Sequence, residues 1–252
     1  MLNLSDVTFM IPLRLDSIIR VENVVAGIQV LLNHFKTNII VLEAASHCNH
    51  ILEKLLPEEV QYEFCIDNDP IFHRTKYINQ IAKCCQTPII AIWDADVILP
   101  PRQIASSIRM LRKQNADVVF PYDGHFYDTT KIIRELFIEN NYNIDFLLMN
   151  IDKMLLPYGS SMGGGALFIQ NEAFQRTGGE DERFYGWGPE DWNRIEKWRL
   201  YSLKIRRVRG PLFHLTHPRD INGQHATSLQ KHWSFYYLNK TLMSTIADIQ
   251  RT

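Results

Sequence analysis

Two aspartates directly follow an apolar run in the first half of the chain. Residues 89–93 have the length and β-branched content of a strand buried on both faces, and Asp94 and Asp96 come next, separated by Ala95. Ligands of open α/β sheets bind at the carboxyl ends of the strands, where carboxylates can hold a divalent cation and the phosphates of a substrate. An isolated Asp-x-Asp is also common in surface turns, so the pattern needs support from other groups.

Two histidines, His214 and His217, lie near the end of the chain. From a turn or a short helix, both imidazoles can point at one metal ion. The His-x-x-His pattern is weak evidence for a metal site by itself. Together with the Asp-x-Asp pattern it predicts a mixed nitrogen and oxygen site of the kind that suits Mn²⁺.

An aromatic residue between two glycines, Trp187, precedes an acidic pair, Glu190 and Asp191. The tryptophan is a candidate platform on which the apolar faces of sugar rings stack. The acidic pair opens a predicted helix, where the helix dipole alone favours carboxylates. Beside a bound sugar, one of these carboxylates could instead act as a general base.

Glycines and arginines occur at further positions where a ligand could bind. Residues 163–165 are glycines just before a predicted strand, which allows close approach of a ligand or simply a tight turn. Arg14 and Arg74 are expected near the end of a strand or the start of a helix. Each could hold a phosphate through its planar guanidinium, or be an ordinary surface arginine.

The segments between these groups alternate between strand and helix patterns. Apolar runs predict strands, and apolar residues at helical spacing predict helices between them. The strands are expected at residues 7–12, 38–45, 62–67, 89–93, 117–122, 166–169 and 203–208. This order predicts an α/β fold with an open, mostly parallel, Rossmann-like sheet flanked by helices. The Gly-x-Gly-x-x-Gly fingerprint of dinucleotide-binding proteins is missing after the first strand.

We expect residues 1–252 to form one domain. Residues 123–160 are rich in Tyr, Asn and Asp and are too long for a simple connection. They are either a lid over a substrate or a plain structural insertion.

Composition excludes several classes of protein. The net charge of -1 gives no basic field for nucleic acid, and no apolar run approaches the roughly 18 residues of a membrane span. The four cysteines show no Cys-x-x-Cys spacing, so neither a zinc knuckle nor a disulfide framework is indicated. These features predict a cytoplasmic location, with membrane association through partners as an alternative, and they leave the oligomeric state open.

Taken together, the motifs resemble the metal-dependent GT-A glycosyltransferases, specifically the β-1,4-galactosyltransferase-like branch with its C-terminal galactosyltransferase domain. The segments that carry this resemblance are residues 11–14, 72–79, 93–96, 163–167, 178–191 and 214–220. The pairing of Asp-x-Asp with Trp-Gly-x-Glu-Asp is its most specific part.

The resemblance implies a nucleotide-binding half at 1–122, an acceptor and metal half at 161–252, and 123–160 as a possible acceptor lid. It also implies a role for each matching residue. Asp96, His214 and His217 would bind Mn²⁺, with Mg²⁺ as an alternative. Asp191 would be the catalytic base, and Glu190 and Trp187 would bind the acceptor. The donor-binding residues implied are Pro12, Arg14, Arg74, Asp94, Ala95, Gly164 and Trp187.

The expected activity is transfer of a hexose or N-acetylhexosamine from a UDP-sugar to a sugar hydroxyl of a carbohydrate acceptor, with inversion, in glycan or polysaccharide synthesis. The related polypeptide N-acetylgalactosaminyltransferases share the C-terminal signature but retain configuration, so a retaining enzyme is one alternative. A non-catalytic carbohydrate-binding protein is another. A nucleotidyltransferase fits less well, since residues 12–17 lack a glycine-rich loop. Trp192 and Asn193 also stand where relatives often have further acidic residues, which leaves the acceptor open.

Overall fold

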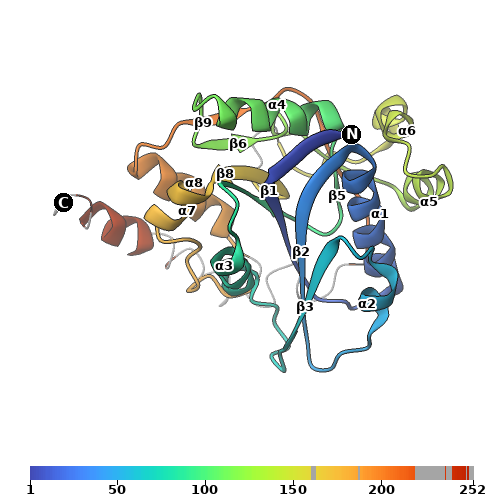
Figure 1. The fold of residues 1–252 in the computed structure, drawn as a ribbon, viewed down its shortest axis with the longest axis horizontal. Helices are drawn as coiled ribbons and strands as arrows, with labels where there is room; N and C mark the ends of the chain where they lie inside the picture. The colour runs from blue at the N-terminus through green and yellow to red at the C-terminus, as the bar shows by residue number, and fades with distance from the viewer. Residues whose placement is uncertain (160–162, 187, 219–235, 237–239, 248, 250–252) are drawn as a thin grey trace.

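The strands of this protein form two sheets in a computed structural model, which describes residues 1–159, 163–186, 188–218, 236, 240–247 and 249 (Figure 1). The larger sheet has seven strands in the order β3-β2-β1-β4-β8-β6-β9. Their bounds are β1 Leu2–Leu13, β2 Phe35–Ala45, β3 Val60–Ile66, β4 Ile89–Trp93, β6 Val118–Phe120, β8 Ala166–Gln170 and β9 Ile205–Arg207. The smaller sheet has the order β5-β10-β7, with bounds β5 Val97–Ile98, β7 Phe126–Asp128 and β10 Leu212–His214.

The first four strands of the chain form one parallel part of the large sheet, and β6 and β9 form a second parallel pair. Strand β1 pairs in parallel with β2 and β4, and β2 pairs in parallel with β3. Strand β8 then runs antiparallel between β4 and β6, so the sheet is largely rather than wholly parallel. All five residues of β4 are buried, as expected for a strand covered on both faces. The predicted α/β fold class is confirmed.

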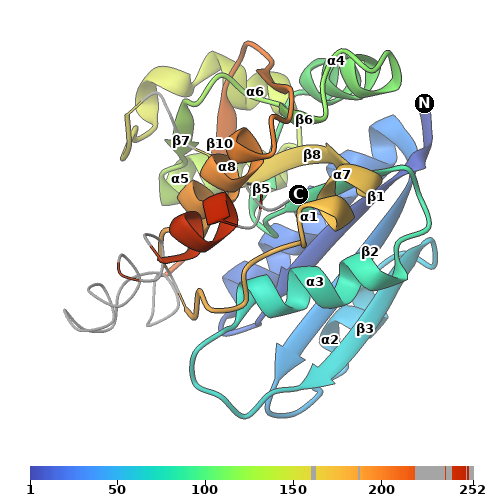
Figure 2. The ribbon, with the colours of Figure 1, turned by 90° about the vertical axis from the view of Figure 1, so that its left-hand side faces the viewer.

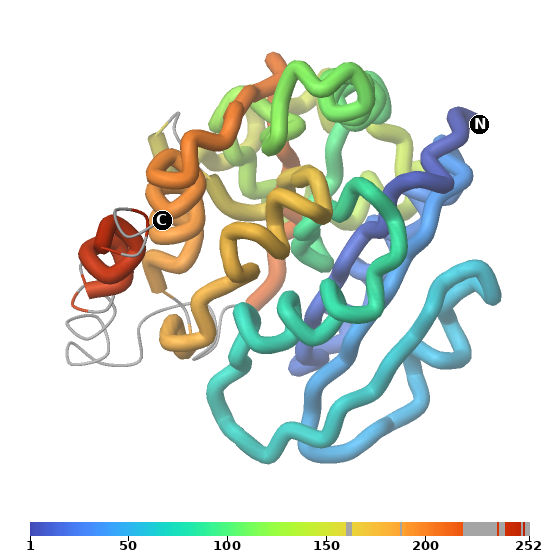
Figure 3. The backbone as a smooth tube through the Cα atoms, turned by 60° about the vertical axis from the view of Figure 1, so that its left-hand side comes forward, coloured from blue at the N-terminus to red at the C-terminus, as the bar shows by residue number. Residues whose placement is uncertain are grey.

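Helices cover both faces of the large sheet. Helix α1 and helix α2 lie on one side, and α3 and α7 lie on the other (Figures 1 and 2). The helix bounds are α1 Ile18–His34, α2 Ile51–Leu55, α3 Arg74–Cys84, α4 Pro101–Arg112, α5 Lys131–Glu139, α6 Ile144–Met149, α7 Asn171–Arg176 and α8 Glu190–Leu200. Residues 240–247 are also helical and lie beside α8 (Figure 3), and the Thr241 hydroxyl there donates to Asp181 at 2.8 Å.

The segment 123–160 contributes to a second core rather than only to the surface. It contains β7, α5, α6 and a 3₁₀ turn at Ile151–Lys153. Ile133 and Phe137 pack with Phe213 of β10 and with the α1 face. Its predicted role as an acceptor lid stays a prediction.

The helices described are all too short or too polar to cross a membrane.

Candidate active site

The turn after β4 connects the two sheets. The Asp94 amide donates to the Gly165 carbonyl at 2.8 Å, which ties the turn to the start of β8. The chain then enters β5, which pairs antiparallel with β10 so that Val97 lies opposite His214. Because β5 begins directly after Asp96, this register places His214 beside that aspartate. His214 ends strand β10, and His217 lies in the loop that follows.

Asp96, His214 and His217 form a cluster whose ligand atoms all lie within 4.8 Å of one another. Oδ2 of Asp96 is 3.1 Å from Nε2 of His217 and 3.5 Å from Nε2 of His214. The other ring nitrogen of each histidine is engaged, since Nδ1 of His214 donates to Asp128 at 2.9 Å and Nδ1 of His217 donates to the Pro218 carbonyl at 2.7 Å. Both Nε2 atoms therefore face the aspartate. Sequence reasoning missed Asp128.

The charges in this cluster stabilise one another. Burial favours the neutral form of Asp96, but His214 and His217 outweigh it and hold the pKa of Asp96 well below its usual range. Burial also opposes a charge on His214, yet Asp96 and Asp128 raise the pKa of His214 to about 9. A buried carboxylate with two imidazole nitrogens, one of them oriented by a further carboxylate, fits a Mn²⁺ ion.

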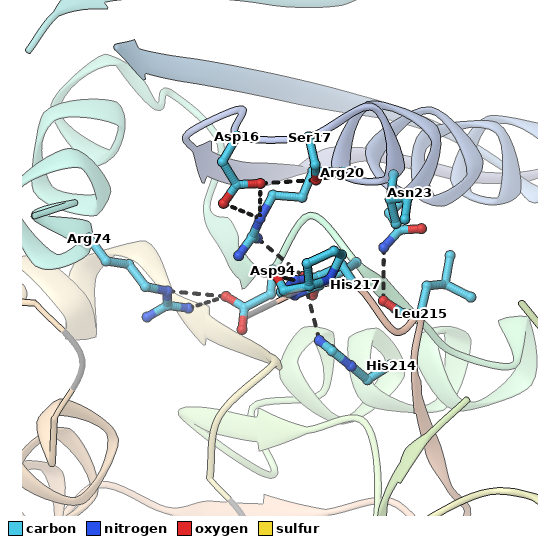
Figure 4. Close-up of polar contacts among 12 residues, drawn as sticks. Asp16, Ser17, Arg20, Asn23, Arg74, Asp94, His214, Leu215 and His217 are labelled. Atoms are coloured by element: carbon cyan, nitrogen blue, oxygen red, sulfur yellow. Dashed lines mark hydrogen bonds and ion pairs between the residues drawn. The ribbon is translucent and has the colours of Figure 1, made fainter. Parts of the chain in front are cut away.

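Arg74 and Asp94 form an ion pair next to this cluster (Figure 4). Nε and Nη2 of Arg74 contact Oδ1 of Asp94 at 3.1 and 2.5 Å. Nη1 of Arg74 is buried and has no hydrogen-bond partner among the described residues. Burial raises the pKa of Asp94, as do the charges of Asp96 and Asp191, while Arg74 lowers it. A buried donor without a partner is costly, so Nη1 of Arg74 is suited to an anionic or hydroxyl-bearing ligand.

Most hydrogen-bond donors of the Arg14 guanidinium are paired with other groups of the protein. Its Nε donates to the Ala44 carbonyl at 2.9 Å, and Nη1 donates to the carbonyls of Asp69 at 2.7 Å and Pro70 at 3.1 Å. Nη2 contacts Asp67 at 2.5 Å. In this arrangement Arg14 shapes the loop after β3, and a direct contact with a donor stays a prediction.

The acidic pair opens α8, and each of its members has a different environment. Glu190 is buried and accepts the Gly188 amide at 3.1 Å. Burial, followed by the charge of Asp191, raises the pKa of Glu190 to about 8. Oδ1 of Asp191 contacts Nη1 of Arg194 at 2.5 Å, and Arg194 also binds both carboxylate oxygens of Glu180 at 2.7 and 2.9 Å. Arg194 was not among the predicted residues, although its spacing from Asp191 is typical of a helical ion pair.

The loop before α8 is fastened to helix α3. Asn79 donates to the Glu180 carbonyl at 2.9 Å, Thr75 donates to the Phe184 carbonyl at 3.1 Å, and His73 contacts the Glu182 carbonyl at 2.8 Å. Arg74 belongs to the same helix. These hydrogen bonds hold the loop, and with it Glu190 and Asp191, on the same side of the sheet as Arg74.

Comparison with known proteins identifies the fold. Residues 147–220 match the family model described as the N-terminal domain of galactosyltransferase. The catalytic domain of Drosophila β1,4-galactosyltransferase 7, in a complex with xylobiose, superimposes with a TM-score of 0.54 and 16% identity, covering 93% of this chain and 80% of that chain. The chain has the GT-A glycosyltransferase fold.

A second GT-A structure superimposes equally well. Glucosyl-3-phosphoglycerate synthase from Mycobacterium tuberculosis, in complex with Mn²⁺, UDP and phosphoglyceric acid, gives a TM-score of 0.56 and 14% identity, covering 95% of this chain and 78% of that chain. No curated protein sequence matches the chain. The predicted resemblance to GT-A glycosyltransferases of the galactosyltransferase type is confirmed, and so is the predicted enzyme class, a glycosyltransferase.

Within this GT-A fold the remaining predicted residues occupy different places. Pro12 is buried in β1 opposite Leu42, and Ala95 lies in the turn between the two aspartates. Gly164 lies against Asp191, because a Cβ atom at this position would overlap with Oδ2 of that residue. Its predicted contact with the donor stays a prediction. Trp187 lies outside the described residues, as do residues 219 and 220 of the late histidine segment.

Proposed function

We propose that this chain is a metal-dependent glycosyltransferase that moves a hexose or N-acetylhexosamine from a UDP-sugar to a hydroxyl of a carbohydrate acceptor, with inversion. One observation carries the proposal. A cluster of three candidate metal ligands lies one residue from Asp94, the ion-pair partner of Arg74, and the charges of Glu190 and Asp191 act on the same Arg74, whose Nη1 lacks a partner among the described residues. UDP and Mn²⁺ are bound in one GT-A neighbour and a disaccharide in the other, which supports this choice of donor, metal and acceptor.

In this proposal the donor binds at the carboxyl end of β4. Asp96, His214 and His217 would hold Mn²⁺, with Mg²⁺ as the alternative, and the bound ion would neutralise the departing diphosphate. Arg74 would donate its Nη1 hydrogens to the donor while Asp94 holds the rest of its guanidinium in place. Pro12, Arg14 and Ala95 would shape the surface on which the donor lies.

Asp191 is the proposed base. Its carboxylate would take the proton of the acceptor hydroxyl as that oxygen forms the new glycosidic bond and the bond to the diphosphate breaks. Arg194 holds one carboxylate oxygen, which orients the other for this step. Glu190 and Trp187 would bind the acceptor, and Glu190 in its protonated form can donate a hydrogen bond to it. Attack opposite the leaving group gives inversion.

A UDP-release assay tests the proposal. The purified chain is incubated with UDP-glucose, UDP-galactose and their N-acetylated forms, each with Mn²⁺ or with EDTA, and with a panel of mono- and disaccharide acceptors. We expect Mn²⁺-dependent release of UDP with one donor, stimulated by an acceptor and lost in Asp191→Asn. NMR of the product anomer tests inversion. UDP-sugar binding without release from any donor would favour the non-catalytic carbohydrate-binding alternative.

A further inference from the structure

The backbone N–H and C=O of Leu215 are both hydrogen-bonded, and this residue lies between the two histidines of the metal cluster in the chain. Its amide donates to the Asp96 carbonyl at 2.8 Å. Its carbonyl accepts from Nδ2 of Asn23 in α1, also at 2.8 Å (Figure 4). Leu215 and Asn23 are both fully buried. The backbone of Leu215 therefore joins the turn that carries Asp96, the segment that carries the two histidines, and α1.

Asn23 is in turn held by the segment that the sequence marked as an insertion. Its Oδ1 accepts from Nε of Arg134 in α5 at 2.7 Å. Arg134 is only 1% exposed, and it also donates to the Ile19 carbonyl at 3.2 Å and to Glu22 at 2.6 Å. Three segments far apart in the sequence thus meet in one buried polar network. Asn23 uses its amide in both directions, as a donor to Leu215 and as an acceptor from Arg134.

The same segment fixes the other side of the histidine stretch. The Thr129 amide donates to the His214 carbonyl at 2.9 Å, and the Thr129 hydroxyl accepts the Thr216 amide at 3.0 Å. The backbone groups from the His214 carbonyl to the Thr216 amide are therefore all paired. A rigid backbone at this point fixes the separation of His214 and His217, on which simultaneous binding of one ion depends.

We propose that Asn23 and Arg134 are positioning residues of the metal site, so that α5 of the insertion braces the His-x-x-His segment through α1. This inference rests on the proposed function, because it assumes that Asp96, His214 and His217 bind Mn²⁺. Within the described part of the chain, neither residue forms a hydrogen bond or ion pair with the three ligand side chains, so both act through the Leu215 carbonyl.

The substitution Asn23→Asp tests whether Asn23 positions the metal ligands or only attaches α5 to α1. The ionised carboxylate of an aspartate at this position still accepts from Arg134, but it has no hydrogen to donate to the Leu215 carbonyl. The matched control is Asn171→Asp, because Nδ2 of Asn171 also donates to backbone carbonyls, those of Cys85 at 3.2 Å and Thr87 at 3.0 Å. Gln170 pairs with Ile89, the first residue of β4, so Asn171 lies next to the start of that strand. The site lies at the other end of β4, after Trp93.

The experiment is calorimetric titration of each protein with MnCl₂ alone, together with its thermal unfolding in EDTA. We expect the Kd for Mn²⁺ to rise about 10- to 100-fold in Asn23→Asp, the range typical of outer-shell partners, and to be unchanged in Asn171→Asp. Unfolding temperatures in EDTA should fall similarly in the two variants. Where Asn23→Asp does not fold, Arg134→Lys, which keeps the charge but loses the planar fork, carries the same test.

Each outcome decides one question. Wild-type affinity for Mn²⁺ in Asn23→Asp, or an equal loss in the control, overturns the positioning role. Failure of the wild-type chain to bind Mn²⁺ contradicts the proposed function itself rather than the role of Asn23.

Discussion

Replacing Gly164 by alanine should disable the proposed base without disturbing the metal site. A Cβ atom on Gly164 would overlap with Oδ2 of Asp191, whose other oxygen is held by Arg194 at 2.5 Å. The carboxylate would have to move by about 1 Å to restore ordinary van der Waals separation. Arg194 is itself fixed by Glu180, so the strain cannot be relieved by a simple shift of this ion pair.

A displacement of this size in a reacting group lowers the rate by roughly 10²-fold, or about 2.7 kcal/mol in the activation barrier. We therefore expect kcat of Gly164→Ala to fall by about two orders of magnitude, with the KM for the UDP-sugar changed by less than about threefold, because Arg74, Asp94 and the metal cluster are untouched. Steady-state UDP release, with donor and acceptor varied separately, measures both quantities.

The neighbouring glycine supplies the control. A Cβ atom on Gly163 would meet Cδ1 of Ile195, the far end of a flexible side chain, and neither glycine has a positive φ angle. Gly163→Ala should therefore keep most of its activity. A raised donor KM with unchanged kcat in Gly164→Ala would refute the reasoning, and would instead support the donor contact predicted for Gly164 from the sequence.

Further predictions concern the acidic pair and the metal cluster. Asp191→Asn should abolish transfer and leave UDP binding within a few-fold of wild type; equal losses of both would remove Asp191 from the role of base. His217→Ala should raise the Mn²⁺ concentration needed for half-maximal UDP binding by at least about tenfold, and unchanged metal dependence would contradict its assignment as a ligand. Burial and the charge of Asp191 raise the pKa of Glu190 from its ordinary value of 4.5 to about 8 in the folded state. Between pH 4.5 and pH 8 the folded state therefore keeps a proton on Glu190 that the unfolded chain has lost. In EDTA, stability from this group is fully present below pH 4.5 and is lost as pH rises towards 8, by up to about 1.4 kcal/mol per pH unit. Chemical denaturation of Glu190→Gln should therefore show a flatter pH profile than wild type, and identical profiles would contradict the raised pKa.

The sequence predicted the helices and strands whose apolar residues follow a clear pattern along the chain. The apolar residues of α1 recur at helical spacing and those of β4 form one unbroken run, so both elements are predictable from local pattern. Strands β5, β7 and β10 have only two or three residues each, too few to show any period, and they were missed. The pairing of β5 with β10 places His214 beside Asp96, so the geometry of the metal cluster could not be predicted from local sequence patterns either.

The partners of the site residues were harder to predict than the residues themselves. Motifs indicated Asp96, His214 and Asp191, but Asp128 contacts His214 across 86 positions in the chain. Asn23 and Leu215 are 192 positions apart. Such pairs depend on the tertiary fold, and only the Asp191–Arg194 pair had a local signal, its spacing within one helix.

Calorimetric titration of the wild-type chain with UDP, once in MnCl₂ and once in EDTA, tests the central proposal most directly. We predict saturable binding of one UDP per chain in MnCl₂ and its loss, or a weakening of at least about 100-fold, in EDTA, because the metal cluster would hold the diphosphate through the ion. Equal affinity in the two conditions would contradict a metal-dependent site. No binding in either would contradict the proposed nucleotide-sugar donor altogether.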